Sequence, residues 1–221
     1  WKKTEYKDKL VLSVPMLPKL DDVSVEKGAA GEYDGWFKLL AKHLIENELE
    51  HSVIRLGWEM NGGWYKWSAS GKETEFVQFF RNAVNAMRSV EGGDFKFFWN
   101  PALGWINASI PNCYPGDEYV DIVGEDIYPG NHVYDPQVSR FKQAINYGSK
   151  TKITALTENG CIFDIDSAVS INALWCWFMT WGDEFTVNGS NYSEKYTEKS
   201  VITKMYSSKY ALTLENLPSI Y

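Results

Sequence analysis

Short apolar segments that alternate with longer helical patterns are the feature that most constrains the fold of this chain. The apolar segments are rich in Val, Ile and Phe, and they span residues 10–14, 53–58, 95–99, 120–124, 153–156 and 173–178. Helical patterns follow at residues 35–48, 73–90, 136–147 and 198–212. Strands that alternate with helices in this way are typical of βα units with a parallel sheet. The sequence therefore predicts an α/β fold.

Polar or aromatic clusters come after most of these predicted strands. They occupy residues 15–18, 59–61, 100–105, 125–128, 157–160 and 180–183. A (β/α)8 TIM barrel places its active site in such loops, because they converge at one end of the barrel. A doubly wound sheet shows the same alternation but uses one switch point. We therefore predict a single barrel domain over residues 1–221, with the first one or two βα units missing upstream of Trp1.

The composition argues against several classes of function. The chain has 221 residues and a formal net charge of −7, and it has no basic stripe, so we expect no nucleic-acid partner. Its longest apolar runs are the length of a strand, so we expect no membrane span. The three cysteines form no CxxC pattern, and glycine-rich phosphate loops are absent. We therefore expect no metal site and no cofactor.

A carboxylate surrounded by tryptophans points to carbohydrate chemistry. Residues 55–67 read RLGWEMNGGWYKW, so Glu59 follows a predicted strand and lies between Trp58, Trp64 and Trp67. Aromatic residues make up 15% of the chain. Because sugar rings stack on aromatic side chains, these tryptophans are candidate substrate contacts. Surrounded by indoles, Glu59 is expected to retain its proton and to act as a general acid.

A second carboxylate completes a catalytic pair. Glu158 follows the predicted strand 153–156 and precedes Asn-Gly. A retaining glycosidase needs one general acid/base and one nucleophile on different strands, with carboxyl groups about 5–5.5 Å apart. We assign Glu158 as the nucleophile, ionised and accepting a hydrogen bond from the hydroxyl of Tyr128. The alternative is that each glutamate only caps a loop or pairs with a lysine.

Other residues at the predicted strand ends complete the candidate site. Arg55 lies within its strand and could hold a carboxylate by a bidentate pair. Asn61 lies in the polar cluster next to Glu59, and Trp105 and Trp181 follow two further strands. We expect these side chains to bind the substrate, with the tryptophans as stacking platforms.

The segment from Leu10 to about Asp183, above all residues 55–67, resembles glycoside hydrolase family 26. Members of this family are retaining (β/α)8 enzymes best known as β-mannanases, with relatives that act on β-glucans and β-xylans. The resemblance implies that Glu59 is the acid/base, that Glu158 is the nucleophile and that Tyr128 contacts it. It also implies that Trp181 forms the floor beneath the reacting sugar.

Two departures from the family pattern leave the substrate open. The mannanases usually place His directly before the acid/base, where this chain has Trp58. They also carry a sugar-binding His where this chain has residues 15–18, PMLP. The leading hypothesis is a retaining endo-β-glycosidase that acts on a β-mannan-type polysaccharide or oligosaccharide by double displacement. The alternatives are an inactive carbohydrate-binding or structural barrel, and the same mechanism on a β-glucan, a xylan or a microbial exopolysaccharide. We expect an extracellular or secreted protein.

Overall fold

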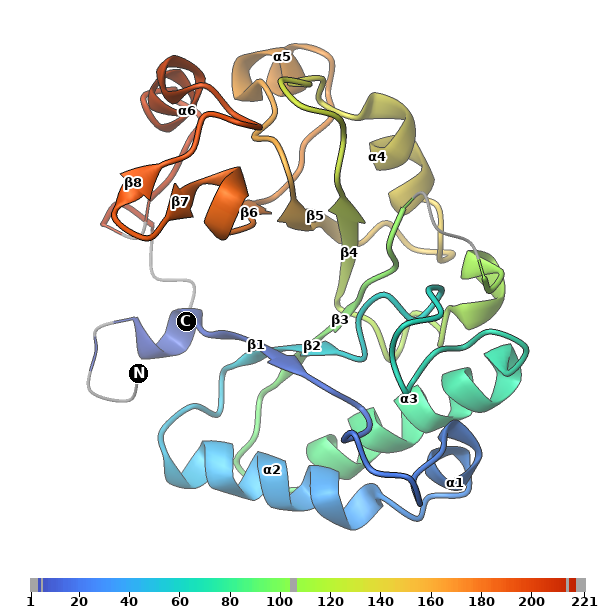
Figure 1. Ribbon diagram of the computed structural model, residues 1–221. Coiled ribbons are helices and arrows are strands. Elements are labelled where there is room, and N and C mark those ends of the chain that lie inside the picture. Colours follow the sequence, from blue (N-terminus) through green and yellow to red (C-terminus); the bar gives the residue numbers. More distant parts are fainter. Residues whose placement is uncertain (1–3, 5, 104–106, 214, 218–221) are drawn as a thin grey trace. The chain divides into compact units, whose positions relative to one another are not determined.

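The chain folds as two compact units, which are described separately below. The computed structural model describes residues 4, 6–103, 107–213 and 215–217. The first unit contains residues 1–123 and 147–152, and the second contains residues 124–146 and 153–221. Both consist of parallel strands with helices between them (Figure 1), which confirms the predicted α/β class. That the whole chain belongs to one barrel domain stays a prediction.

The sheet of the first unit is parallel throughout and is built from the expected strands. Val11 pairs with Val53, and Val53 pairs with Lys96, while Phe98 pairs with Ile122. Strand β4 leaves the first unit after Val123 and continues into the second. The strands are β1 (Val11–Val14), β2 (Val53–Leu56), β3 (Lys96–Trp99) and β4 (Ile122–Ile127).

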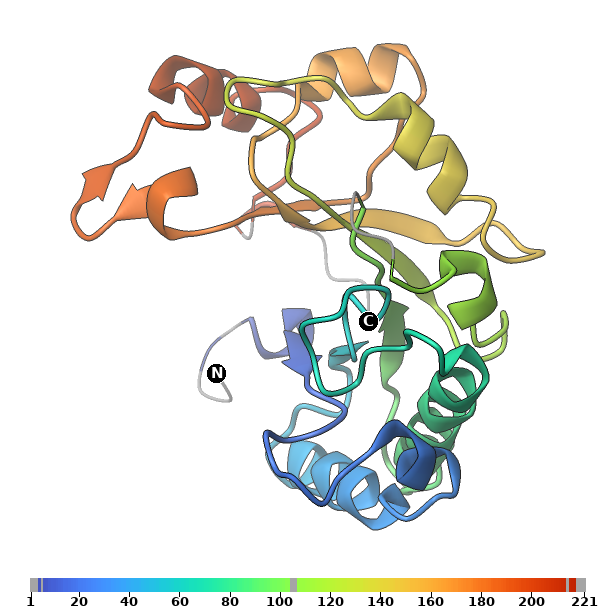
Figure 2. The same ribbon diagram turned by 45° about the vertical axis from the view of Figure 1, so that its right-hand side comes forward.

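Three helices lie on the same side of β1–β3 in both views of the molecule (Figures 1 and 2). They are α1 (Val25–Ala29), α2 (Asp34–Glu46) and α3 (Glu73–Arg88). Helix α1 is an addition to the predicted elements. The residues of α3 that repeat at helical spacing form its buried face, as an amphipathic helix requires. They are Phe76, Phe79, Phe80, Ala83, Val84, Ala86 and Met87. Short 3-10 helices occur at Lys7–Lys9 and Ile110–Cys113.

In the second unit, β4 is followed in the sheet by β5 (Ile153–Asn159) and β6 (Phe178–Thr180). Its helices are α4 (Val138–Ala144), α5 (Ile165–Ser170) and α6 (Lys199–Tyr206). A 3-10 turn at Asp183–Phe185 leads into the antiparallel hairpin of β7 (Val187–Asn188) and β8 (Asn191–Tyr192), which lies beside α6 (Figure 2). Helix α5 and this hairpin were not predicted. No helix in the described part of the chain has the length and apolar character needed to cross a membrane.

The sixth strand differs from the prediction. The predicted segment was 173–178, whereas β6 begins at Phe178. The amides of Ala173 and Trp175 donate to nearby carbonyls of Ala168 and Ala173, so these residues stay out of the sheet. Pairing with β5 starts at Cys176, whose amide donates to the Thr154 carbonyl at 2.8 Å. Ala173 and Trp175 are therefore buried in a turn before β6, whereas Leu174 between them is 52% exposed.

Strands β4 and β5 extend further than predicted. The expected ends were residues 124 and 156, but the strands reach Ile127 and Asn159. Glu125 and Glu158 therefore lie inside strands and not in the loops after them. Both side chains are buried, at 0% and 7% exposure. Polarity is a poor guide to the end of a strand here, because these strands bury polar residues near their carboxyl ends.

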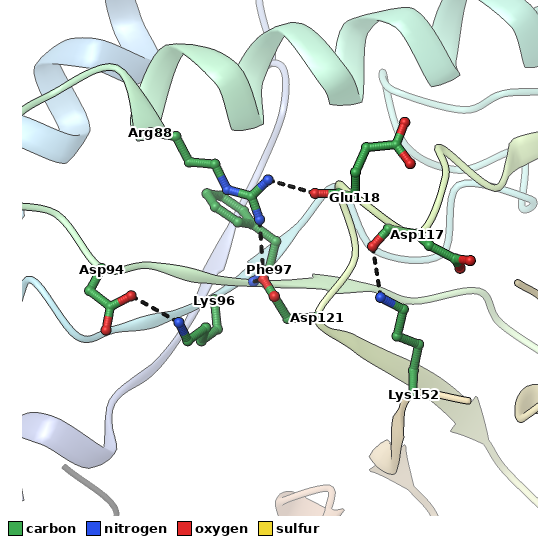
Figure 3. Close-up of polar contacts among 8 residues, drawn as sticks. All are labelled: Arg88, Asp94, Lys96, Phe97, Asp117, Glu118, Asp121 and Lys152. Atoms are coloured by element: carbon green, nitrogen blue, oxygen red, sulfur yellow. Dashed lines mark hydrogen bonds and ion pairs between the residues drawn. The ribbon is translucent and has the colours of Figure 1, made fainter. Parts of the chain in front are cut away.

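Polar contacts tie α3 and the β3–β4 connection to the sheet of the first unit (Figure 3). The guanidinium of Arg88 donates to the Glu118 carbonyl at 2.7 Å and lies 5.2 Å from the centre of the Phe97 ring. The Asp121 carboxylate accepts from the Phe97 amide at 2.8 Å and from Arg88 at 3.4 Å. The Lys152 ammonium donates to the Asp117 carbonyl at 2.7 Å. These bonds fasten Lys152 and the end of α3 to the β3–β4 connection, and that connection to β3.

The close packing of α1 against α3 gives a test of the first unit. A Cβ added to Gly28 would overlap the Phe79 ring, whereas a Cβ added to Gly35 in α2 would meet nothing within 4 Å. We expect Gly28→Ala to lower the free energy of unfolding by about 1–3 kcal/mol, because overpacking strains the core. Gly35→Ala should raise it by about 0.5–1 kcal/mol through helix propensity. Urea unfolding of both variants measures this difference, and equal effects would contradict the packing described.

The Asp117 carboxylate gives a prediction about pH. Hydrogen bonds from Ser149 and Tyr114 lower its pKa below the ordinary value of 3.8. A lowered pKa in the folded state stabilises the protein above pH 3.8 and loses this effect as the pH falls through the folded pKa. We expect Asp117→Asn to destabilise the protein at neutral pH, with a difference from wild type that narrows as the pH drops below 3.8.

Urea midpoints measured from pH 7 downward check this expectation. Asp22→Asn is the matched control, because the Asp22 carboxyl has no polar partner among the residues that the structure describes. A difference between Asp117→Asn and wild type that stays constant over the whole range would show that the carboxylate has no such role.

Candidate active site

A tight turn carries the chain from β2 to Glu59. Gly57 and Glu59 both have φ of 53°, in the left-handed region. The Gly57 amide donates to the Val14 carbonyl at 3.1 Å, and a Cβ at Gly57 would overlap the sulfur of Met16. Only glycine combines this φ with so close an approach. The glycine before the predicted acid/base therefore has a steric function.

The backbone of Glu59 is strained, since a side chain disfavours this conformation by about 1–2 kcal/mol. Two hydrogen bonds hold it there. The Glu59 amide donates to the Asn100 carbonyl at 2.7 Å, and the Glu59 carbonyl accepts from the Gly62 amide at 3.0 Å. Strained residues of this kind cluster at functional sites, where the surrounding structure fixes them. Asn100, directly after β3, is thus a supporting residue that the sequence analysis did not assign.

Trp64 contacts Glu59 through its N–H group. Its Nε1 donates to Oε2 of Glu59 at 2.8 Å, and its ring lies against Gly62, where a Cβ would overlap it. The indole is 48% exposed, and Glu59 itself is only half-buried. The expectation that three tryptophans desolvate Glu59 is therefore corrected. A hydrogen bond donated to a carboxylate favours its ionised form.

The other two tryptophans of the segment form a cluster with Tyr65. Trp58 donates from Nε1 to the Tyr65 hydroxyl at 3.0 Å, and Trp67 donates from Nε1 to the Trp58 carbonyl at 2.8 Å. Tyr65 and Trp67 are stacked, with ring centres 4.4 Å apart. Trp67 is only 4% exposed, while Trp58 is half-buried. Trp67 therefore supports the turn, and its ring is not available as the expected stacking platform.

Arg55 and Asn61 are also buried supports. Arg55 donates from Nε to Oδ1 of Asn100, and its guanidinium lies 5.2 Å from the centre of the Trp58 ring. Asn61 is fully buried and exchanges two hydrogen bonds with the backbone of Ala102, at 2.7 and 2.9 Å. We therefore no longer place Arg55 and Asn61 among the expected substrate contacts. Trp105, another expected contact, lies outside the described residues.

In the second unit, Glu158 lies in an irregular part of β5. Leu156 pairs with Phe178, but Asn159 pairs with Thr180. Between these two pairs β5 advances by three residues and β6 by two, so β5 contains one extra residue. Glu158 lies in this irregular part of the strand. β-bulges re-aim side chains and are common next to active sites. The local backbone, rather than simple alternation along a strand, therefore sets the direction of this side chain.

Tyr128 lies beside Glu158, as the sequence analysis expected. Its hydroxyl donates to Oε2 of Glu158 at 2.6 Å, and the side chain is 42% exposed. Asn159, the next residue, accepts at its carbonyl from the Trp181 amide at 3.0 Å. Trp181 is 46% exposed. The second unit thus gathers a carboxylate, a phenol and an indole at the carboxyl ends of its strands.

A cavity of about 840 Å³ also lies in the second unit, between β6, the hairpin and α6. Its lining is largely apolar, and three of its hydroxyl groups donate to backbone carbonyls. Thr186 donates to the Trp181 carbonyl, Thr203 to that of Lys199, and Ser207 to that of Thr203. A sugar site needs several polar groups that converge on the ligand. This cavity is therefore not the candidate active site.

Comparisons with known proteins identify a family of glycoside hydrolases. The model of glycosyl hydrolase family 26 matches residues 39–216. A mannan endo-1,4-beta-mannosidase of Thermothelomyces thermophilus is 30% identical over 162 residues, which cover 72% of this chain and 30% of that protein. Mannan endo-1,4-beta-mannosidase B of Piromyces sp. is 28% identical and is matched over 73% of this chain and 25% of its own length. The chain thus spans less than a third of these curated relatives.

A solved structure with the same fold is the β-mannanase from a symbiotic protist of the termite Reticulitermes speratus, in complex with gluco-manno-oligosaccharide. It aligns with a TM-score of 0.74 and 20% identity over 91% of this chain and 61% of that one. This likeness confirms the predicted fold class. Because the family model covers well over half of the sequence, the chain belongs to glycosyl hydrolase family 26.

Proposed function

We propose that the protein is a retaining β-glycosidase in which Glu59 and Glu158 act on the same glycosidic bond. One observation carries this proposal: each carboxylate lies at the carboxyl end of a strand on an irregular backbone. Glu59 has φ of 53°, and Glu158 lies in the register shift of β5. Irregularities that cost free energy without improving packing are typical of functional sites. Both irregularities occur at the carboxylates that the family resemblance implies are catalytic.

The contacts of each carboxylate support its role. The carboxylate of Glu158 attacks the anomeric carbon while the bond to the leaving oxygen breaks, and Glu59 donates a proton to that oxygen. Glu59 is then ionised, a form that the N–H of Trp64 stabilises. In the second step Glu59 removes a proton from water, which attacks the same carbon and releases Glu158. The Tyr128 hydroxyl holds one oxygen of Glu158 in position throughout.

For the substrate we propose a β-mannan-type polysaccharide cleaved at internal bonds. Two findings support this proposal. The similar curated proteins are named mannan endo-1,4-beta-mannosidases, and the protist enzyme was solved in complex with gluco-manno-oligosaccharide. Trp64 and Trp181 are about half exposed and could stack on sugar rings, as could the half-buried Trp58. Trp58 replaces the histidine usual in the resembled mannanases, which favours a β-glucan, a xylan or a microbial exopolysaccharide as the second candidate. Because such polymers do not enter cells, we also propose an extracellular location.

The mechanism predicts large effects of both carboxylates on turnover. Glu158→Ala should lower kcat on β-mannan by several orders of magnitude, because no covalent intermediate can form. Glu59→Ala should lower it by about 10²–10⁴-fold, the usual contribution of a general acid/base. On an aryl β-manno-oligosaccharide, whose leaving group needs no proton, added azide should restore turnover in both variants. In Glu158→Ala azide attacks the anomeric carbon in place of the carboxylate, and in Glu59→Ala it attacks the glycosyl-enzyme in place of water. Release of reducing ends measures the hydrolysis of β-mannan, and release of the aryl group measures the reaction with azide.

Glu91→Gln is the control, because Glu91 is an exposed residue of the first unit far along the chain from both glutamates. It should leave turnover unchanged. Near-normal hydrolysis by Glu158→Ala would refute the assignment. Binding of polysaccharide by wild type without release of reducing ends would favour the alternative, an inactive carbohydrate-binding barrel.

A further inference from the structure

A row of three aromatic rings leads away from Glu158 in the second unit. The Phe185 ring meets the Tyr128 ring edge-on, with centres 5.4 Å apart and planes at 65°. On its other side Phe185 stacks on Tyr196, with centres 4.1 Å apart and planes at 28°. Phe185 therefore lies between Tyr128, which holds the proposed nucleophile, and Tyr196.

Gly160 packs closely against two of these rings, Phe185 and Tyr128. A Cβ at this position would lie 3.1 Å from carbon atoms of both Phe185 and Tyr128, tighter than normal packing. The Gly160 amide donates to the Ile127 carbonyl at 3.2 Å, so its backbone is fixed to the end of β4. The main chain two residues after Glu158 thus fits closely against both rings. Gly160 therefore limits the movement of the Tyr128 ring on the side that it contacts.

Tyr196 is anchored independently of the site. Its hydroxyl donates to Oε1 of Glu184 at 3.2 Å, and the same carboxylate accepts from Lys195 at 2.5 Å. The Tyr196 carbonyl accepts from the His132 amide at 2.9 Å and from the Cys161 thiol at 3.1 Å. Phe185 therefore packs on a ring that is held at both its hydroxyl and its backbone.

We propose that Phe185 is a positioning residue for catalysis: it fixes the Tyr128 ring so that its hydroxyl stays on Glu158. The inference rests on the function proposed above. Tyr128 is 42% exposed, so without a neighbour its ring could adopt other rotamers and leave the carboxylate. Phe185 does not touch the reacting atoms and acts only through Tyr128. The nucleophile is thus supported by a side chain from the turn after β6.

A double-mutant cycle tests this role. An edge-on aromatic pair contributes enough for Phe185→Leu to lower kcat/KM by about five- to tenfold. In the Tyr128→Phe background, which lacks the hydroxyl to be positioned, the same substitution should have almost no further effect. Phe185→Tyr, which keeps the ring, should restore most of the activity. The rate of covalent trapping by a 2-deoxy-2-fluoro-mannoside, an agent that labels a nucleophile, should fall in parallel with kcat/KM.

Phe141→Leu is the matched control. Phe141 is also half-buried and meets Trp175 edge-on at 5.2 Å, but it lies on α4 away from this row of rings. It should leave kcat/KM and trapping unchanged. If Phe185→Leu proves poorly folded, Gly160→Ala provides a second test, because its methyl group pushes on both rings and should also slow trapping.

The outcomes separate this inference from the proposed function. An active wild type in which Phe185→Leu is as fast as wild type, or in which its effect is the same with and without the Tyr128 hydroxyl, would overturn the positioning role alone. A wild type that binds but never hydrolyses polysaccharide would overturn the proposed function, and the positioning role with it.

Discussion

The hydrogen bond from the Glu59 amide to the Asn100 carbonyl holds the turn after β2, on which the proposed acid/base lies. At 2.7 Å it holds a glutamate in the left-handed conformation at the point where the chain leaves β2. Asn100 also accepts from the buried Arg55, so one residue after β3 fixes both the backbone of the turn and a side chain of the neighbouring strand. The rings of Trp58, Tyr65 and Trp67 contact one another, and the Trp67 N–H donates to the Trp58 carbonyl within the turn.

The second unit holds its carboxylate, Glu158, by different contacts. Here the strand itself is irregular, and the extra residue in β5 sets the direction of Glu158. A phenol hydrogen bond at 2.6 Å fixes the carboxylate, and a row of rings fixes the phenol. Both units thus hold a carboxylate on distorted backbone with aromatic support. An indole N–H donates to Glu59 and a phenol O–H donates to Glu158.

Much of the fold could be predicted from residue types and their spacing. The periodicity of Phe76, Phe79 and Phe80 predicted α3, and the apolar runs predicted the first five strands. The sixth strand could not be placed, because an apolar segment before β6 looks the same whether it is buried in a turn or in a sheet. The end of β5 could not be placed for a related reason, because a polar residue such as Glu158 is more typical of a loop than of a buried strand.

The roles of the aromatic residues were the hardest to predict. Trp64 and Trp67 are three residues apart and chemically identical, yet one is half exposed and the other buried. Their difference depends on Tyr65, whose ring covers Trp67, and on the direction of each indole N–H. Asn100 and Phe185 were missed because their roles come from backbone contacts and ring packing between segments far apart in the sequence. Spacing along the chain carries no signal of such contacts.

The central claim is that Glu59 and Glu158 serve one sugar ring. It is tested most directly by a crystal structure of the protein with a fluorinated glycoside trapped on Glu158, in which the distance between the two carboxyl groups is measured. The account predicts a separation of about 5–5.5 Å, as a retaining mechanism requires. A separation of about 6.5–9.5 Å, which leaves room for a water molecule, or a label on another residue, would contradict it.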